Sequence, residues 1–210
     1  MTQRSAKIDI ILLAAGNSSR MGSENKLLMR HGRSTLIRHT AQQIINAKIG
    51  DLAVVTGFEA DQVQRELQGL NLKFCHNFDH DTGQMSSVKA GSQVIDPMAK
   101  GMMVALSDMP YLKPMDYRNI VRHFFANGGQ KITVPFYGEE RGNPIVIPAA
   151  LISEIACGSL NAGCRKLVQD HPNKIVQVKF ENSAYVSDID TPADYVNCMK
   201  YGATPSAICC

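Results

Sequence analysis

A loop of small side chains near the start of the chain has the clearest chemical potential in this sequence. It follows an apolar stretch, Ile8 to Leu13, and ends in two cations, Arg20 and Lys26. Glycine and serine let several backbone N–H groups converge on one anion, and the cations supply formal positive charge. An ordinary strand–loop–helix connection has a similar composition, but the length of this loop and its two cations favour phosphate binding. The predicted nucleotide-binding loop comprises Leu13, Ala14, Ala15, Gly16, Asn17, Ser18, Ser19, Arg20 and Lys26.

Carboxylates at two later places could hold a divalent cation. Asp108 comes after a strongly apolar run, and Pro110 prevents a helix from continuing through it. A carboxylate close to a phosphate loop suits Mg²⁺ that bridges phosphate oxygens. Asp188 and Asp190 alternate, so both face the same side of an extended segment. Asp190 could instead cap the helix that follows, and the spacing leaves open which of the two binds metal. We predict a metal site formed by Asp108 and Asp190.

Other kinds of catalytic site find little support in the sequence. The loop lacks the Gly-Lys-Ser/Thr ending of a Walker A motif, and it lacks the G-x-G-x-x-G spacing of nicotinamide and flavin enzymes. Ser18, Ser19 and Ser86 have no G-x-S-x-G context that would mark a nucleophile. His76 and His80 are four residues apart, but their loop-like surroundings argue against a helical metal pair.

The elements that must position these residues alternate between strand and helix patterns. Apolar runs predict strands at 8–13, 51–56, 72–76, 101–106, 131–135, 143–147 and 174–179. Helical patterns span 34–48, with Ser34 as N-cap, and 59–67, 85–95, 114–127, 149–155, 162–169 and 192–200. We predict one α/β domain over 1–210, with a core at about 8–200 and a tail at 201–210. Its architecture is a three-layer α/β/α sandwich with a mostly parallel, Rossmann-like sheet. The loop, Asp108 and Asp190 then follow carboxyl ends of strands, where ligands bind.

Composition narrows the class of protein further. The 210 residues are 44% hydrophobic with a net charge of +3, and they lack dense Lys/Arg runs, so we expect no nucleic acid partner. No apolar window approaches the roughly 20 residues of a membrane span, and the first residues are polar, so we expect neither a membrane association nor a secretory leader. The six cysteines show no C-x-x-C spacing, which is typical of reduced thiols and predicts a cytoplasmic location.

Five ordered motifs resemble a known family. Residues 12–28 (LLAAGNSSRMGSENKLL) resemble the signature of the nucleotidyltransferases that include molybdenum cofactor cytidylyltransferase and guanylyltransferase. The segments 83–88, 106–110, 141–147 and 188–195 match further family motifs, so the resemblance covers roughly residues 8–200. One departure is Asn161, where close relatives tend to carry aspartate, and it affects the expected second-substrate pocket.

The resemblance implies a glycosyltransferase-A-like nucleotidyltransferase fold and a set of residue roles. Arg20, Lys26 and Asp108 would be catalytic, and Asp108 and Asp190 would hold Mg²⁺, with Mn²⁺ as an alternative. Gly83, Ser86 and Ser87 would approach the base and ribose, and Arg141, Asn143 and Pro144 would bind the acceptor.

The implied reaction is transfer of CMP from CTP to the molybdenum cofactor with release of pyrophosphate. Ala14-Ala15-Gly16 resembles the version of the loop in CTP-using members, although another NTP remains an alternative donor. A recipient molybdoenzyme is an expected partner. Two alternatives stay open: a nucleotidyltransferase acting on a sugar or polyol phosphate, and a non-catalytic carrier that delivers the cofactor to a molybdoenzyme.

Overall fold

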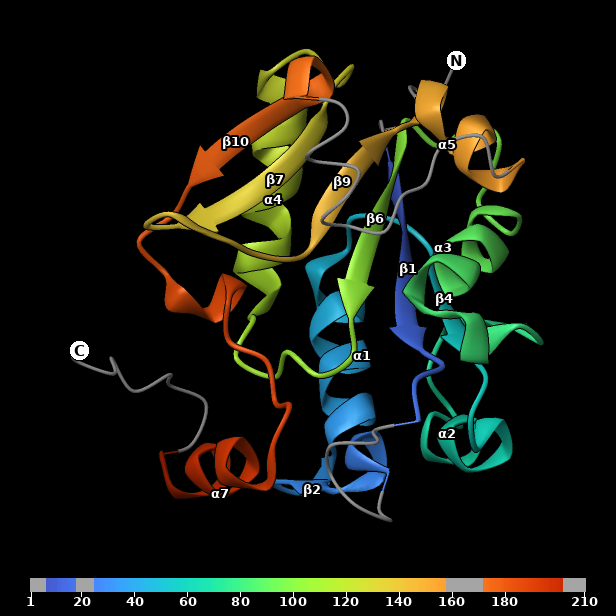
Figure 1. The fold of residues 1–210 in the computed structure, drawn as a ribbon, viewed down its shortest axis with the longest axis vertical. Helices are drawn as coiled ribbons and strands as arrows, with labels where there is room; N and C mark the ends of the chain where they lie inside the picture. Colours follow the sequence, from blue (N-terminus) through green and yellow to red (C-terminus); the bar gives the residue numbers. More distant parts are fainter. Residues whose placement is uncertain (1–6, 18–24, 158–171, 202–210) are drawn as a thin grey trace.

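A mixed β-sheet forms the centre of the protein in the computed structural model, which describes residues 7–17, 25–157 and 172–201. The strands are β1 (Ile8–Ala14), β4 (Leu52–Thr56), β5 (Lys73–His76), β6 (Gly101–Leu106), β7 (Ile132–Tyr137), β8 (Glu140–Arg141), β9 (Ile145–Pro148) and β10 (Ile175–Lys179). Their order across the sheet is β10-β7-β9-β6-β1-β4-β5, and β8 pairs with β7 (Figure 1).

Strand β1 lies in the middle of the parallel half of the sheet. All seven of its residues are buried, as its apolar sequence predicts for a strand covered on both faces. It pairs in parallel with β4 and β6, with Ala14 opposite Thr56 and Leu13 opposite Leu106. The carboxyl ends of three neighbouring strands therefore meet at one edge. Strand β9 is antiparallel to both β6 and β7, so the predicted mostly parallel sheet is confirmed, with β8 and β9 as its antiparallel members.

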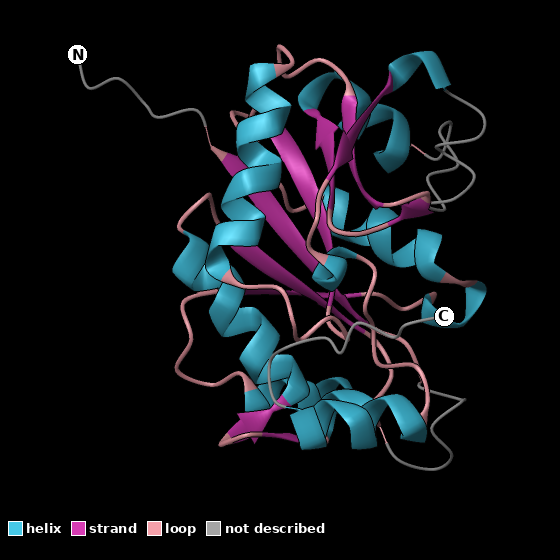
Figure 2. Cartoon of the chain, turned by 90° about the vertical axis from the view of Figure 1, so that its left-hand side faces the viewer, coloured by secondary structure: helices cyan, strands magenta, loops and turns pink. Residues whose placement is uncertain are grey.

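Helices cover both faces of the sheet and give the predicted three layers (Figure 2). The helices are α1 (Leu36–Ala47), α2 (Ala60–Glu66), α3 (Gln84–Ser92), α4 (Pro114–Ala126), α5 (Ala149–Ala156) and α7 (Pro192–Tyr201). Alternate side chains of β1 point to opposite faces. Ile10 and Leu12 pack in the core cluster that contains α1 and α4, whereas Ile11 and Leu13 pack in the cluster that contains α3 and α5. None of the described helices is long and apolar enough to cross a membrane.

The start of α1 differs from the sequence prediction. We expected a helix from Ser34, but Ser34 and Thr35 form strand β3 (Ser34–Thr35), which pairs with β2 (Arg30–His31) in a small hairpin. The helix begins at Leu36 with Thr35 as its N-cap residue. Pairing across the hairpin fixes these two residues in an extended conformation, which local helical periodicity cannot reveal. The predicted helix at 162–169 lies outside the described residues.

Candidate active site

A pocket of about 550 Å³ lies at the edge where the carboxyl ends of β1 and β6 meet. Its walls come from the segment after β1, from the start of α3 and from the segments that carry Asp108 and Asp190. Lys26 enters from the 3₁₀ turn Lys26–Leu28, whose N-cap Asn25 accepts a hydrogen bond from the backbone N–H of Leu27. Segments that are distant along the chain thus contribute to one cavity.

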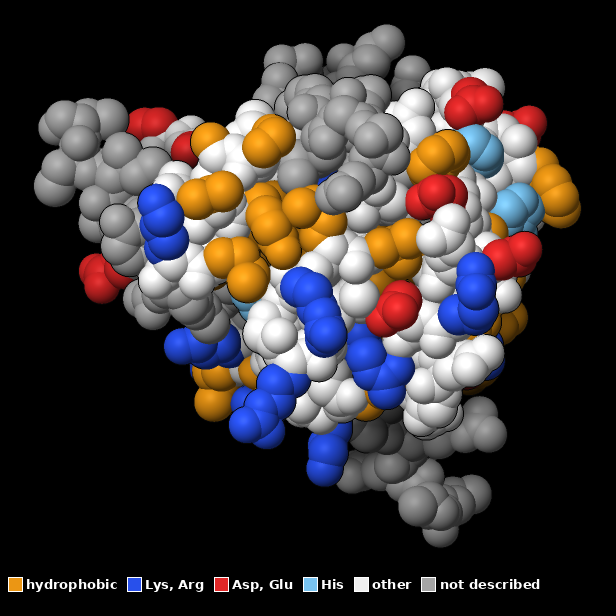
Figure 3. Space-filling model, turned by 90° about the horizontal axis from the view of Figure 1, so that it is seen from below, with side chains coloured by type: hydrophobic (Ala, Val, Ile, Leu, Met, Phe, Trp, Pro, Cys, Tyr) orange, Lys and Arg blue, Asp and Glu red, His pale blue; other side chains and the backbone are white. Residues whose placement is uncertain are grey.

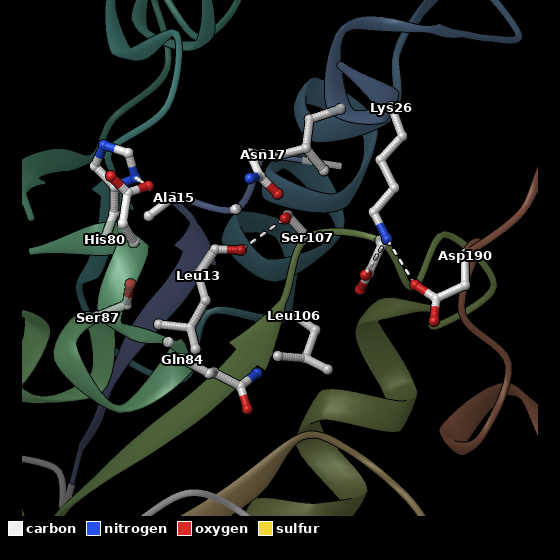
Figure 4. Close-up of a pocket in the computed structure, with 15 residues that line it drawn as sticks. Leu13, Ala15, Asn17, Lys26, His80, Gln84, Ser87, Leu106, Ser107 and Asp190 are labelled. Atoms are coloured by element: carbon white, nitrogen blue, oxygen red, sulfur yellow. Dashed lines mark hydrogen bonds and ion pairs between the residues drawn. The ribbon is translucent and has the colours of Figure 1, made fainter. Parts of the chain in front are cut away.

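One end of the pocket is a cluster of a cation and carboxylates (Figure 4). The Lys26 Nζ donates to Asp108 Oδ2 at 2.7 Å, to Asp190 Oδ1 at 2.9 Å and to the carbonyl of Ile189 at 2.8 Å. Burial of the ammonium group opposes its charge, but the attraction of Asp108 and Asp190 outweighs that cost and raises the pKa of Lys26. The Lys26 ammonium group therefore joins the two carboxylate segments.

The carboxylates at this end fit a hard divalent cation. Asp108, Asp188 and Asp190 each offer an oxygen, and these oxygens lie within 4.8 Å of one another. The Oδ1 of Asp108 is buried and accepts no hydrogen bond from any described residue. Carboxylate oxygens are the ligands that Mg²⁺ and Mn²⁺ prefer. This buried oxygen, which has no hydrogen-bond partner in the described part of the chain and lies close to two further carboxyl groups, is therefore available for coordination.

Asp188 adds to the negative charge of this cluster. The residue is exposed as a whole, yet its carboxyl lies against the other two. Partial burial of the carboxyl, together with the negative charges of Asp108 and Asp190, raises the pKa of Asp188 to about 6. The lysine cation thus does not fully compensate the three acidic groups, and a bound divalent cation would.

The two strand ends that frame this cluster are tied together by buried hydrogen bonds. The Ser107 Oγ donates to the carbonyl of Leu13 at 2.6 Å, which joins the end of β6 to the end of β1. The backbone N–H of Ile189 donates to the carbonyl of Asp108 at 2.9 Å. These bonds fix the spacing between the loop after β1 and both carboxylate segments.

The opposite end of the pocket is formed around Ala15. Leu13 and Ala15 face the pocket, while Ala14 points to the other side of the sheet and packs in the core. A Cβ atom at Gly57 would lie 2.7 Å from the Cβ of His80 and 2.9 Å from the Cβ of Ala15. Only glycine at position 57 therefore leaves room for both His80 and Ala15 beside it. Figure 4 shows Ala15 and His80 across the pocket from Lys26 and Asp190.

A buried asparagine organises the start of α3. The Nδ2 of Asn77 donates to Ser86 Oγ at 2.8 Å and to Ser87 Oγ at 3.0 Å, and its Oδ1 accepts from the N–H of Asp79 at 3.0 Å. Asn77 is only 3% exposed, so these bonds replace those it would make with water. Ser87 lines the pocket, and Asn77 therefore positions this wall from behind.

The structure brings most of the predicted site together in this pocket. The predicted residues that line it are Leu13, Ala15, Gly16, Asn17, Lys26, Gly83, Ser87, Asp108 and Asp190. Ala14 and Ser86 are adjacent to lining residues but are not part of the lining. Ser18, Ser19 and Arg20 lie outside the described residues. The lining residues that the sequence analysis missed are Leu27, His80, Asp81, Gln84, Leu106 and Ser107. Four of these belong to or adjoin the quoted motifs, whereas no pattern distinguished His80 and Asp81.

The predicted acceptor residues do not line the pocket. Arg141 ends β8, and the N–H of Asn143 donates to the carbonyl of Tyr185 at 2.8 Å, next to the chain segment that leads to Asp188. The Nε and Nη2 of Arg141 and the Oδ1 of Asn143 are buried without a hydrogen-bond partner among the described residues. Buried polar groups of this kind require a partner, which a ligand can supply.

Sequence comparisons assign this chain to a known class of domain. A family model described as the MobA-like NTP transferase domain matches residues 10–175. The molybdenum cofactor cytidylyltransferase of Escherichia coli (strain K12) is 26% identical over 196 residues, which cover 92% of this chain and 96% of that protein.

Solved structures show the same fold. The Rv0371c protein of Mycobacterium tuberculosis H37Rv superposes with a TM-score of 0.79 at 23% identity and covers 93% of this chain and 98% of its own. A further structure of that protein is a complex with manganese. A nucleotidyl transferase from Methanothermobacter thermautotroptrophicus has a TM-score of 0.77 at 22% identity, over 93% of this chain and 97% of its own. At these identities the likeness concerns the fold alone.

Proposed function

The chain belongs to the MobA-like NTP transferase family, and on this premise we propose that it transfers CMP from CTP to the molybdenum cofactor with release of pyrophosphate. The terminal phosphate of the acceptor attacks the α-phosphorus of the nucleotide in line. The P–O bond to the β-phosphate breaks, and pyrophosphate leaves. A relative named molybdenum cofactor cytidylyltransferase, matched over nearly the whole of both chains, supports this choice of donor and acceptor.

This reaction requires no general base. A phosphate monoester has a second pKa of about 6 and is already a dianion at neutral pH. The work left to the protein is to position two anionic substrates and to neutralise their charge. A pocket that contains a half-buried lysine and carboxylates supports a transfer of this kind.

Each group at the charged end of the pocket has a distinct role in the proposal. The loop amides after β1 bind the β- and γ-phosphates, with Arg20 beside them, and Lys26 binds the α-phosphate. Asp108 and Asp190 hold Mg²⁺ or Mn²⁺, which neutralises phosphate charge when bound. Lys26 Nζ now contacts both carboxylates, so it exchanges these contacts for a phosphate oxygen when nucleotide binds. Arg141, Asn143 and Pro144 contribute to acceptor binding.

The preference for CTP rests on the end of the pocket around Ala15. The methyl group of Ala15 lies beside the ring of His80. It leaves less room next to the loop than a glycine at position 15 would. We infer that the smaller cytosine ring is favoured there over guanine. Pocket contacts of this size discriminate by about 1–3 kcal/mol, which corresponds to roughly 10- to 200-fold in rate.

One observation carries the proposal above all others. The cation Lys26 and the carboxylates Asp108 and Asp190 come from three separate parts of the chain and converge at the strand ends where the small-residue loop begins. A triphosphate with a divalent cation requires both kinds of group, because the phosphates need positively charged donors and the cation needs carboxylates.

A pyrophosphate-release assay that crosses the four NTPs with a panel of acceptors tests the proposal. The acceptors are molybdenum cofactor, sugar phosphates and polyol phosphates. We expect pyrophosphate with CTP and molybdenum cofactor. Release with a sugar or polyol phosphate instead would assign the alternative acceptor class, and tight cofactor binding without release would indicate a carrier. Transfer of the product to a molybdoenzyme in the same mixture would identify the recipient.

A further inference from the structure

Two consecutive residues of α1 hold the backbone on either side of Asp108. The Oγ1 of Thr40 donates to the carbonyl of Ser107 at 3.2 Å, and the Nε2 of His39 lies 3.1 Å from the carbonyl of Pro110. These two carbonyls bracket the proposed metal ligand. Helix α1 runs alongside the end of β6, so its rigid backbone serves as the platform for both bonds (Figure 1).

The surroundings of His39 make it a neutral donor at this position. A carbonyl only accepts hydrogen bonds, so Nε2 of His39 carries the proton. The ring of His31 from β2 lies at 4.3 Å from the His39 ring, edge to face. Beyond His31, the Sγ of Cys198 in α7 lies 3.5 Å from His31 Nδ1, and Tyr111 is hydrogen-bonded to Cys198. Burial lowers the pKa of His39, and burial together with His39 lowers that of His31.

The other contacts of the Asp108 segment hold different groups, including the salt bridge between Lys26 and the Asp108 carboxylate. Ser107 is tied to β1 through its side chain, and the carbonyl of Asp108 accepts from the N–H of Ile189. The carbonyls of Ser107 and Pro110 are held only through Thr40 and His39 among the described contacts. Thr40 is 1% exposed, so the loss of its hydroxyl would leave the Ser107 carbonyl without a nearby water to replace it.

We propose that His39 and Thr40 are positioning residues that fix the Asp108 segment in the conformation that binds a divalent cation. The proposal rests on the proposed function, in which Asp108 is a metal ligand. Groups that orient metal ligands from behind strengthen metal binding, because ligands that are already in place lose less conformational freedom when the cation arrives. Neither residue lines the pocket.

The test measures Mn²⁺ affinity without nucleotide, by electron paramagnetic resonance of free Mn²⁺, on the full chain. His39→Asn places an amide near the Nδ1 position, too short to reach Pro110, and we expect Mn²⁺ binding to weaken about three- to tenfold. His39→Gln places its amide nitrogen near the Nε2 position and should restore wild-type affinity.

Thr40→Val removes the hydroxyl at constant shape and should weaken Mn²⁺ binding similarly, whereas Thr40→Ser should not. His123→Asn, at an exposed histidine of α4, is the matched control.

Wild-type Mn²⁺ affinity in His39→Gln and Thr40→Ser separates positioning from a general loss of stability. Thermal unfolding of each variant confirms that it is folded. Thr40→Val carries the test alone if His39→Asn does not fold. Equal Mn²⁺ affinity for wild type and Thr40→Val, while Asp108→Asn loses binding, would overturn the positioning role and leave the proposed function intact. Unchanged Mn²⁺ binding in Asp108→Asn would overturn the metal site of the proposed function and the positioning role with it.

Discussion

At the scale of single residues, Lys26 has two competing sets of partners. It forms salt bridges with Asp108 and Asp190 in the structure, and the proposed reaction needs its charge on a phosphate. Removing one electrostatic group of this kind typically costs roughly 10²–10³ in kcat. The same removal also frees two carboxylates from a cation. Turnover and metal affinity should therefore respond to Lys26 in opposite directions.

Lys26→Ala should lower the rate of pyrophosphate release by about two to three orders of magnitude and tighten Mn²⁺ binding in the absence of nucleotide. The gain in affinity follows because the incoming cation no longer displaces an ammonium group. Lys100→Ala, an exposed lysine before β6, is the control and should change neither quantity. Weaker Mn²⁺ binding in Lys26→Ala would contradict the competition.

The three aspartates should differ in importance. Asp108 and Asp190 line the pocket and contact Lys26. Asp188 has an oxygen within 4.8 Å of oxygens of the other two, but it does not line the pocket. We expect Asp108→Asn and Asp190→Asn each to lower kcat about 100-fold or more, and Asp188→Asn to lower it less than tenfold. Pyrophosphate release at saturating Mg²⁺ measures the difference. A larger loss at Asp188 than at Asp190 would show that the roles of the two are exchanged.

At the scale of elements, α3 depends on a residue outside it. Asn77 follows β5 and holds Ser86 and Ser87, so the pocket wall formed by α3 is positioned by the end of a neighbouring strand. The helix also packs very closely on the sheet. A Cβ at Gly91 would lie 2.9 Å from side-chain atoms of both Ile11 and Val55. The strand end and the helix are thus joined by hydrogen bonds and close packing.

Asn77→Ala should weaken nucleotide binding and lower the free energy of unfolding by about 1–3 kcal/mol, because buried hydrogen-bonding groups lose their partners. Calorimetric titration with CTP and urea denaturation measure the two effects. Asn71→Ala, in an exposed turn before β5, is the control. Wild-type affinity for CTP in Asn77→Ala would separate this asparagine from the pocket.

The contact between α1 and the β2–β3 hairpin should make stability fall in acid. Burial lowers the pKa values of His31 and His39 below 6.5, so the unfolded chain binds more protons than the folded protein below that pH, and folding weakens as the pH falls. Asp188, with its pKa raised to about 6, acts in the opposite direction below pH 6. The difference between wild type and His39→Gln isolates the histidine. The free energy of unfolding of His39→Gln, measured by urea denaturation, should fall less between pH 7.5 and 5.0 than that of wild type. The His123→Gln variant should match wild type.

At the scale of the whole molecule, the two edges of the sheet carry different charged groups. Strands β1 and β6 point down in Figure 1, and Figure 3 shows Lys and Arg side chains gathered on the face seen from below. A basic face at the carboxyl ends of these strands favours the approach of anionic substrates. The opposite edge carries Lys7 among three aspartates, and hydrogen bonds to Asp96 and Asp51 raise the pKa of Lys7.

Asp9 supports that opposite edge and should matter for stability alone. It is 3% exposed, and its carboxylate accepts from the backbone N–H groups of Asp51 and Asp96 and lies 3.4 Å from Lys7 Nζ. Asp9→Ala should lower the free energy of unfolding by about 1–3 kcal/mol, because buried donors lose their acceptor. Its kcat should equal that of wild type, and Asp61→Ala on the surface of α2 should leave both unchanged. A fall in kcat at constant folded fraction would connect this edge to the reaction.

Local patterns in the sequence determined the elements and the kind of chemistry. Apolar runs such as Ile10 to Leu13 and Gly101 to Leu106 identify buried strands, because alternation disappears when both faces of a strand are covered. The small-residue loop before Lys26 and the aspartate after β6 pointed to phosphate and metal binding. The motifs also led to the family that the comparisons show.

Tertiary structure decided which of these groups meet. Lys26 contacts carboxylates 82 and 164 positions away along the chain, at 2.7 and 2.9 Å. His80 joins the wall only because Gly57 leaves room beside Ala15, and His39 reaches Pro110 only because α1 packs across the end of β6. Periodicity and turn chemistry act over a few residues and can be read from the sequence. Contacts between strand ends and helix faces depend on the packing of the whole chain.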